Sequence, residues 1–317
     1  MSFSAARPTQ RASRLPKVAS SVMMLAVIGV LCATSGGLLR GQKVVLGRIW
    51  PSGQRLPLDQ VPHDAWDELL RRYVDESGQV DYSAWRASAA DVAALDEYLA
   101  QLSRGDPARD TRRVAQLAFW INAYNALTIR GILREPPVAS IQDHVSNLGG
   151  YNIWSDLLLI VGDDAFSLGQ IEHQILRPLR DPRIHFAIVC GSKGCPRLRQ
   201  NAYGASDLDG QLDDNARDFF ADPHKLDFDA TTGALHLSPI LKWYAEDFGE
   251  SPVDVLRAIT PYLPDETAAR LNNPASVRVK YLEYNWSLNE QSTPPVPPPA
   301  TGDSATNGGD APAQDPN

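Results

Sequence analysis

The amino-acid sequence predicts an α+β fold: a single, mainly helical domain with a small mixed β-sheet, preceded by one N-terminal membrane or signal helix. Apolar residues recur at helical spacing in several long segments, whereas short apolar runs bounded by turn residues indicate strands. These elements do not follow the regular βαβ order of a parallel sheet. With 317 residues, 43% of them hydrophobic, the chain can bury one substantial core.

The N-terminal region predicts export. Residues 1–17 are basic and are expected to stay in the cytoplasm, and residues 18–39 carry no charge. The uncharged segment fits a cleaved signal peptide, and its length also fits a retained transmembrane anchor. We therefore expect membrane contact through this segment and a location in the cell envelope, in the periplasm or on the periplasmic side of the inner membrane. The net charge of −8 argues against a nucleic-acid partner.

The rest of the chain divides by composition. Residues 40–60 are expected to form a tether, residues 61–290 the globular domain, and residues 291–317 a disordered tail rich in Pro, Ala and Gly. Ser167 suits the N-cap of a helix that carries Glu172 and His173. The spacing of apolar residues predicts further helices over 63–74, 83–102, 110–134, 208–220, 240–248 and 252–263. Strands are predicted over 185–190 and 277–284, and hairpins over 157–166 and 225–237.

The segment 185–196 holds two of the three cysteines. Its apolar first half predicts a buried strand that delivers Cys190 and Cys195 into a Gly-rich turn. Because Pro196 is a favoured first helical residue, Cys195 would lie at a helix N-terminus close to basic residues, where a thiolate is favoured. Cys195 is then the candidate nucleophile and Cys190 the more buried thiol. In an oxidising compartment the two cysteines would instead form a disulfide that closes a tight loop.

A thiol nucleophile needs a base, and His173 and His185 are the candidates. Asn122 and Asn125 lie three residues apart on an apolar helix, so their amides require partners: the backbone of a crossing loop, a histidine, or a substrate. A zinc site built from these histidines and the cysteines is disfavoured by the wide cysteine spacing, and no metal or cofactor is expected. Contacts to an unknown small-molecule or peptide ligand are expected from Tyr124, Ser192, Arg197 and Glu172.

Five blocks of the chain resemble the DUF547 family, a bacterial and plant domain of unknown function. The blocks occur in order and are unusual in composition. The family name records no activity, so the resemblance implies no reaction. Plant relatives join the domain to a leucine-zipper-like region, which indicates a module used in different compartments and slightly favours a functional thiol site. The blocks are FWINAYNAL (119–127), SLGQIEHQILR (167–177), DPRIHFAIVCGSKGCPRLR (181–199), WYAEDF (243–248) and YLEYNWSLN (281–289).

Two hypotheses follow. In the first, the exported domain is a cysteine-dependent hydrolase or acyl transferase, with Cys195 as nucleophile, His173 or His185 as base, and Asn122 or Asn125 as an orienting or oxyanion group. In the second, it is a non-catalytic binding or structural domain of the cell envelope, in which the two cysteines form a disulfide. A histidine ring nitrogen close to a free sulfur in an open pocket would favour the first hypothesis, and bonded sulfurs would favour the second.

Overall fold

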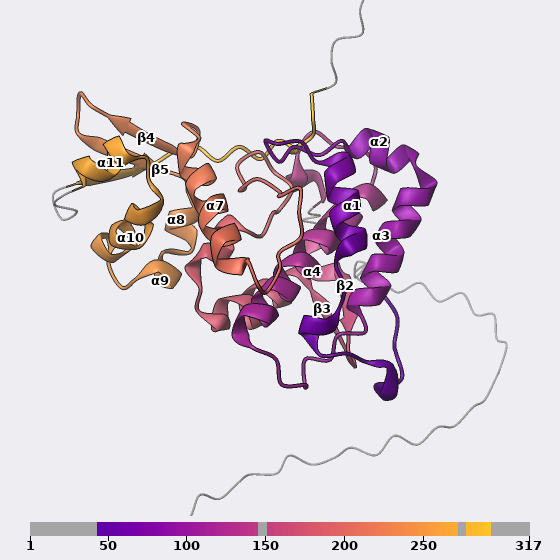
Figure 1. Cartoon of the computed structure of the whole chain (residues 1–317). Helices are drawn as coiled ribbons and strands as arrows, with labels where there is room; N and C mark the ends of the chain where they lie inside the picture. Colours follow the sequence, from indigo (N-terminus) through magenta and orange to yellow (C-terminus); the bar gives the residue numbers. More distant parts are fainter. Residues whose placement is uncertain (1–42, 145–150, 272–276, 293–317) are drawn as a thin grey trace, which may run out of the picture. The chain divides into compact units, whose positions relative to one another are not determined.

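The computed structural model describes residues 43–144, 151–271 and 277–292 (Figure 1). The predicted signal or anchor helix over 18–39 and nearly all of the predicted tail over 291–317 lie outside these ranges. Among the described helices, none combines the length and apolar character needed to cross a bilayer. The described ranges contain both helices and short strands, which confirms the α+β class.

Strands form two small sheets in the described ranges, where the sequence predicted one. Each sheet has three strands, with one parallel and one antiparallel pair, in the orders β1-β2-β3 and β4-β5-β6. The hairpins β2–β3 and β4–β5 were both predicted, and Gly162 and Gly233 take positive φ angles of 66° and 68° at their turns. The strands are β1 (Val44–Leu46), β2 (Leu157–Val161), β3 (Asp164–Ser167), β4 (Leu226–Asp229), β5 (Ala234–Leu237) and β6 (Arg278–Tyr281).

The segment 43–60, predicted as a tether, is part of the folded domain. Strand β1 pairs in parallel with β2, which places Val44 opposite Leu157. The buried guanidinium of Arg55 donates two hydrogen bonds to Asp163 in the β2–β3 turn, at 2.6 and 2.5 Å. The polar composition of this segment suggested a tether, because its partners β2 and Asp163 lie more than one hundred residues away in the sequence.

Helix α4 is central to the first hydrophobic core. It is buried along almost its whole length and packs against α2, α3, α6 and β2. The predicted single helix over 83–102 is divided at Ser88, whose hydroxyl caps α3 by accepting from the backbone N–H of Asp91. The helices of this region are α1 (Asp64–Tyr73), α2 (Tyr82–Ala87), α3 (Ala89–Leu102), α4 (Arg113–Arg134), α5 (Ile153–Asp156) and α6 (Leu168–Gln170).

A second hydrophobic core joins α7 to the β4-β5-β6 sheet. Phe219 and Phe220 of α7 pack on Phe186, and the apolar side chains of β5 complete the cluster. The predicted helix over 240–248 is divided into α8 and α9 at Tyr244. The helices of this region are α7 (Leu208–Ala221), α8 (Ile240–Trp243), α9 (Ala245–Phe248), α10 (Pro252–Ile259) and α11 (Asp265–Arg270).

The predicted strand over 185–190 is wrong, and so is the helix expected to begin at Pro196. Residues Pro182–Phe186 form a 3-10 helix, and the chain then runs without regular structure to α7. Side chains take the place of a neighbouring strand: the amide of Asn125 accepts from Val189 N and donates to Ala187 O. An apolar run signals burial, but its partners are set by the tertiary fold.

Candidate functional site

Buried asparagine side chains hold the cysteine-containing loop in place. The amide of Asn125 bonds to the backbone of Ala187 and Val189, at 3.0 and 2.9 Å. Asn122 bonds in the same way to both the N–H and the C=O of Tyr203, each at 2.9 Å. Backbone from crossing loops thus satisfies both amides, one of the alternatives open from the sequence.

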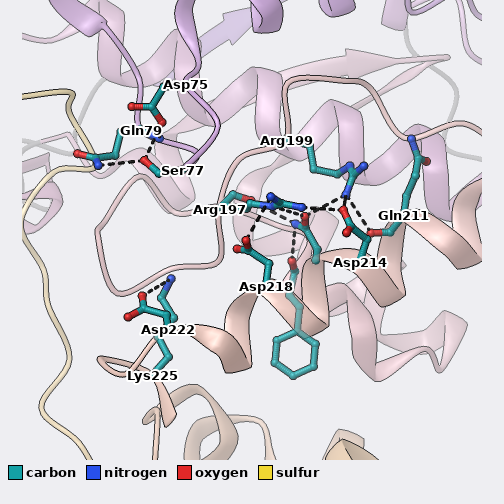
Figure 2. Close-up of polar contacts among 12 residues, drawn as sticks. Asp75, Ser77, Gln79, Arg197, Arg199, Gln211, Asp214, Asp218, Asp222 and Lys225 are labelled. Carbon is teal, nitrogen blue, oxygen red and sulfur yellow. Dashed lines mark hydrogen bonds and ion pairs between the residues drawn. The ribbon is translucent and has the colours of Figure 1, made fainter. Parts of the chain in front are cut away.

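Ionic contacts fix the chain that follows Cys195. Arg197 and Arg199 both reach Asp214 on α7, and Arg197 also pairs with Asp218 at 3.2 Å (Figure 2). Asn215, one residue further along the helix, donates to the carbonyls of Phe186 and Arg197. Arg197, predicted to contact a ligand, is therefore engaged in holding the loop to α7.

A disulfide bond joins Cys190 and Cys195, with their Cα atoms 6.3 Å apart. The hydroxyl of Tyr284 lies 3.2 Å from the sulfur of Cys195 and accepts a hydrogen bond from Ser192 at 3.0 Å. Gly194 leaves room for the Tyr284 ring, because a Cβ there would lie 2.8 Å from ring atoms. A bonded sulfur cannot act as a thiolate, so chemistry at Cys195 would first require reduction of the bond.

Many of the predicted site residues line one cavity of about 390 Å³. Asn122 and Asn125 are not among its lining residues, and Ser192 and Arg197 instead line a neighbouring cavity of about 490 Å³. Cys195 lines both cavities. The predicted residues that line the first cavity are Tyr124, Glu172, His173, His185, Cys190 and Cys195.

Glu172 is the buried acid of this cavity. Only 7% of the residue is exposed, and it lies in a π-helical turn, Ile171–Leu176, that continues α6. Such turns are frequent at functional sites. Its Oε2 accepts a hydrogen bond from Tyr124 at 3.3 Å, whereas its Oε1 is buried without a hydrogen-bond partner in the described structure. Ser167 caps α6 in a reciprocal box with Gln170, as predicted for this position.

His185 lies deep in the cavity wall. Its Nε2 is 2.7 Å from the carboxylate of Asp247, and its ring stacks on Tyr244 with centroids 4.0 Å apart. Burial lowers the pKa of His185, and Asp247 offsets only part of this effect, so the ring is neutral at pH 7. Burial opposes ionisation of Asp247, but hydrogen bonds from Arg177 and His185 hold its pKa below the usual value. His173 is exposed, with Nδ1 3.3 Å from Arg177.

Aromatic rings form the rest of the wall, and the sequence did not identify them as site residues. Trp243, Tyr284 and Trp286 form a cluster with ring centroids 4.4 to 5.7 Å apart. Burial raises the pKa of Tyr284 to about 12, so its hydroxyl stays protonated. Trp243 is 47% exposed, which leaves part of a large apolar ring open to solvent. Tyr244 and Trp154 also line the cavity. Most of these aromatic residues lie in the family-like blocks at 243–248 and 281–289, which were the sequence feature that could have identified them.

Comparison with protein families matches residues 108–220 to a family described as "Protein of unknown function, DUF547". The DUF547 resemblance expected from the sequence is thereby confirmed over this segment. No curated protein and no solved structure gives a significant match. The DUF547 segment contains Glu172, both histidines and both cysteines of the cavity, whereas Trp243, Tyr284 and Trp286 come from beyond it.

Proposed function

We propose that this chain is a cell-envelope binding domain that takes a small organic ligand into the aromatic cavity, with the Cys190–Cys195 disulfide as a fixed part of the wall. The observation that carries the proposal is that the bonded cysteines line the same cavity as an aromatic cluster and a buried carboxylate. Ligand sites are typically apolar cavities with a few placed polar groups. A volume of about 390 Å³ is within the range for small ligands.

Export is a separate element of the proposal. It rests on the basic residues 1–17 and the uncharged segment 18–39, and contact with the membrane through that segment belongs to the same proposal. The disulfide supports it, because such bonds persist in oxidising compartments such as the periplasm.

Gly169 offers a direct test, because it lines the cavity and has no side chain. A Cβ at this position would lie in ordinary contact with the carbonyl oxygen of Trp154, at 3.5 Å, so a side chain can be added without moving the backbone, and from this lining position it would take up space in the cavity. Gly169→Leu should therefore reduce the cavity volume. Gly210→Leu is the matched control, because Gly210 is exposed on α7 and nothing lies within 4 Å of its Cβ position.

The measurement is ligand-detected NMR with a fragment set that includes amines, alcohols, carboxylates and sugars. We expect fragments that bind the wild-type chain and the Gly210→Leu variant to lose binding to the Gly169→Leu variant. Fragments that bind all three proteins equally, or no binding fragment at all, would contradict the proposed function.

A second candidate function is the thiol-dependent hydrolase or acyl transferase, formed on reduction of the disulfide. It is favoured by one observation: the sulfurs share a cavity with His173 and with His185. The contact of His185 with Asp247 has the base-and-orienting-group arrangement of nucleophilic enzymes. Native alkylation after mild reduction tests it. Rapid labelling of Cys195 alone is expected if it is an activated thiol, and equal slow labelling of both cysteines would count against the enzyme.

A further inference from the structure

The surroundings of Glu172 indicate which chemical class of ligand the cavity binds. A carboxylate that is 7% exposed has lost most of its hydration, and buried charges in proteins are normally paired with an opposite charge. Yet within the described ranges no ion pair involves Glu172, and its Oε1 has no hydrogen-bond donor. An unpaired buried carboxylate oxygen in a cavity wall indicates a partner that arrives with the ligand.

The groups around Glu172 are neutral. Tyr124 donates a hydrogen bond to Oε2 of Glu172, and the phenol of Tyr284 lines the same cavity. Burial raises the pKa of Tyr244, and its phenol lies close enough to the carboxylate for Glu172 to raise that pKa further. His185 is buried against Asp247. The nearby guanidinium of Arg177 is paired with Asp247 at 2.6 Å and with Glu246. The cavity therefore presents one negative charge that no side chain of the described structure neutralises.

The aromatic rings favour the same type of ligand. Trp243, Tyr284 and Trp286 form one continuous aromatic surface, and Trp154 adds a further ring to the wall. The faces of such rings carry negative partial charge and attract cations, most strongly where water is excluded. A neutral sugar could also stack on the rings, but it would leave the charge of Glu172 uncompensated.

We propose that this cavity recognises the protonated primary amino group of a small organic ligand, which donates a hydrogen bond to Oε1 of Glu172 while the aromatic rings surround the rest of the molecule. An N–H donor is required because the free group is a carboxylate oxygen, so a quaternary ammonium would satisfy the charge and not the hydrogen bond. This inference rests on the proposed function of the cavity as a ligand site.

The test compares two probes of nearly the same shape, 2-phenylethylammonium and 2-phenylethanol, with tetramethylammonium as a third. Binding to the full-length oxidised protein is followed by ligand-detected NMR and by the fluorescence of the cavity tryptophans. We expect the ammonium probe to bind at least about tenfold more tightly than the alcohol, because a charge-assisted hydrogen bond adds to cation–π attraction. Tetramethylammonium is expected to lie between them.

The isosteric variant Glu172→Gln assigns the preference to this carboxylate. It should reduce the preference for 2-phenylethylammonium over 2-phenylethanol to the smaller part that cation–π attraction supplies. Alcohol binding should be unchanged, which also shows that the variant is folded. Glu283→Gln is the matched control, because Glu283 is exposed and adjacent to Tyr284 but does not line this cavity. It should keep the wild-type preference.

The outcomes separate the two proposals. If the alcohol binds as tightly as the ammonium probe, or if a methyl glucoside binds more tightly than either, the ammonium inference is overturned and the ligand cavity stands. If Glu172→Gln retains the wild-type ammonium preference, the assignment to Glu172 is overturned. If none of the probes binds and the fragment set also fails, the proposed function itself is overturned.

Discussion

The Nε2 atom of His185 lies 2.7 Å from Oδ2 of Asp247, and this contact ties the 3-10 helix before the cysteine loop to α9. Arg177 donates to the same carboxylate oxygen at 2.6 Å. Segments separated by more than sixty residues thus meet at one carboxylate, directly behind the cavity wall. The positions of His185 and of Tyr244, which stacks on it, depend on this meeting point.

Asp247→Asn should lower the pKa of His185 further. Burial already lowers that pKa, and Asp247 acts in the opposite direction through its charge and hydrogen bond. Removing the charge leaves only the weaker effect of Glu172 to oppose burial. The measurement is an NMR titration of the His185 ring resonances in both proteins.

An exposed pair in the second sheet provides the control for this titration. Asp227 lies 3.2 Å from Nδ1 of His236 and is 55% exposed, so Asp227→Asn should leave the titration of His185 unchanged. An unchanged or raised His185 pKa in Asp247→Asn would contradict the structure.

Asn125→Ala should destabilise the domain by about 3 kcal/mol, because it leaves a buried N–H and a buried C=O without partners. Urea denaturation measures the change in free energy of unfolding. Asn201→Ala, at an exposed position before α7, is the control and should change it by less than about 0.5 kcal/mol. If Asn125→Ala changed the free energy of unfolding as little as the control does, the amide of Asn125 would not stabilise the loop.

Opening the Cys190–Cys195 bond should cost about 2 kcal/mol of stability, since the loop it closes is short. The double variant Cys190→Ser, Cys195→Ser should show this loss in denaturant unfolding, and adding a reductant to it should cause no further change. Peptide mass spectrometry of the oxidised chain should find both cysteines resistant to alkylation until they are reduced. Labelling of either one before reduction would contradict the bond.

Acid should destabilise the domain through His63. Burial lowers its folded-state pKa from 6.5 to about 4. Between these values the unfolded chain takes up a proton that the folded chain does not, so stability falls as the pH drops from about 6.5 to about 4. The free energy of unfolding should fall by about 2–3 kcal/mol. This is less than the full pKa shift would give, because the ring is only partly buried.

The variant His63→Gln should show a smaller loss over the same pH range, measured by urea unfolding at several pH values. His224→Gln, at an exposed ring, is the matched control and should follow the wild-type curve. Wild-type stability that stays constant from pH 6.5 to pH 4 would contradict the lowered pKa of His63.

The sequence by itself determined the elements whose signals are local. Periodicity in the apolar residues located α1, α4 and α7, and turn residues located both hairpins, because helix and hairpin contacts form between residues close in sequence. Ser167 was recognised as an N-cap for the same reason. The residue types and the family blocks also singled out Cys190, Cys195, His185 and Glu172.

Only the tertiary structure decided which partners these residues have. The run before Cys190 is apolar like a strand, yet the side chain of Asn125, more than sixty residues away, replaces a strand partner. The aromatic wall at Trp243 and Tyr284 reaches the cavity from the C-terminal part of the chain. The unpaired oxygen of Glu172 likewise depends on what surrounds it in space. Such long-range contacts are set by packing between distant segments, and no local pattern in the sequence encodes them.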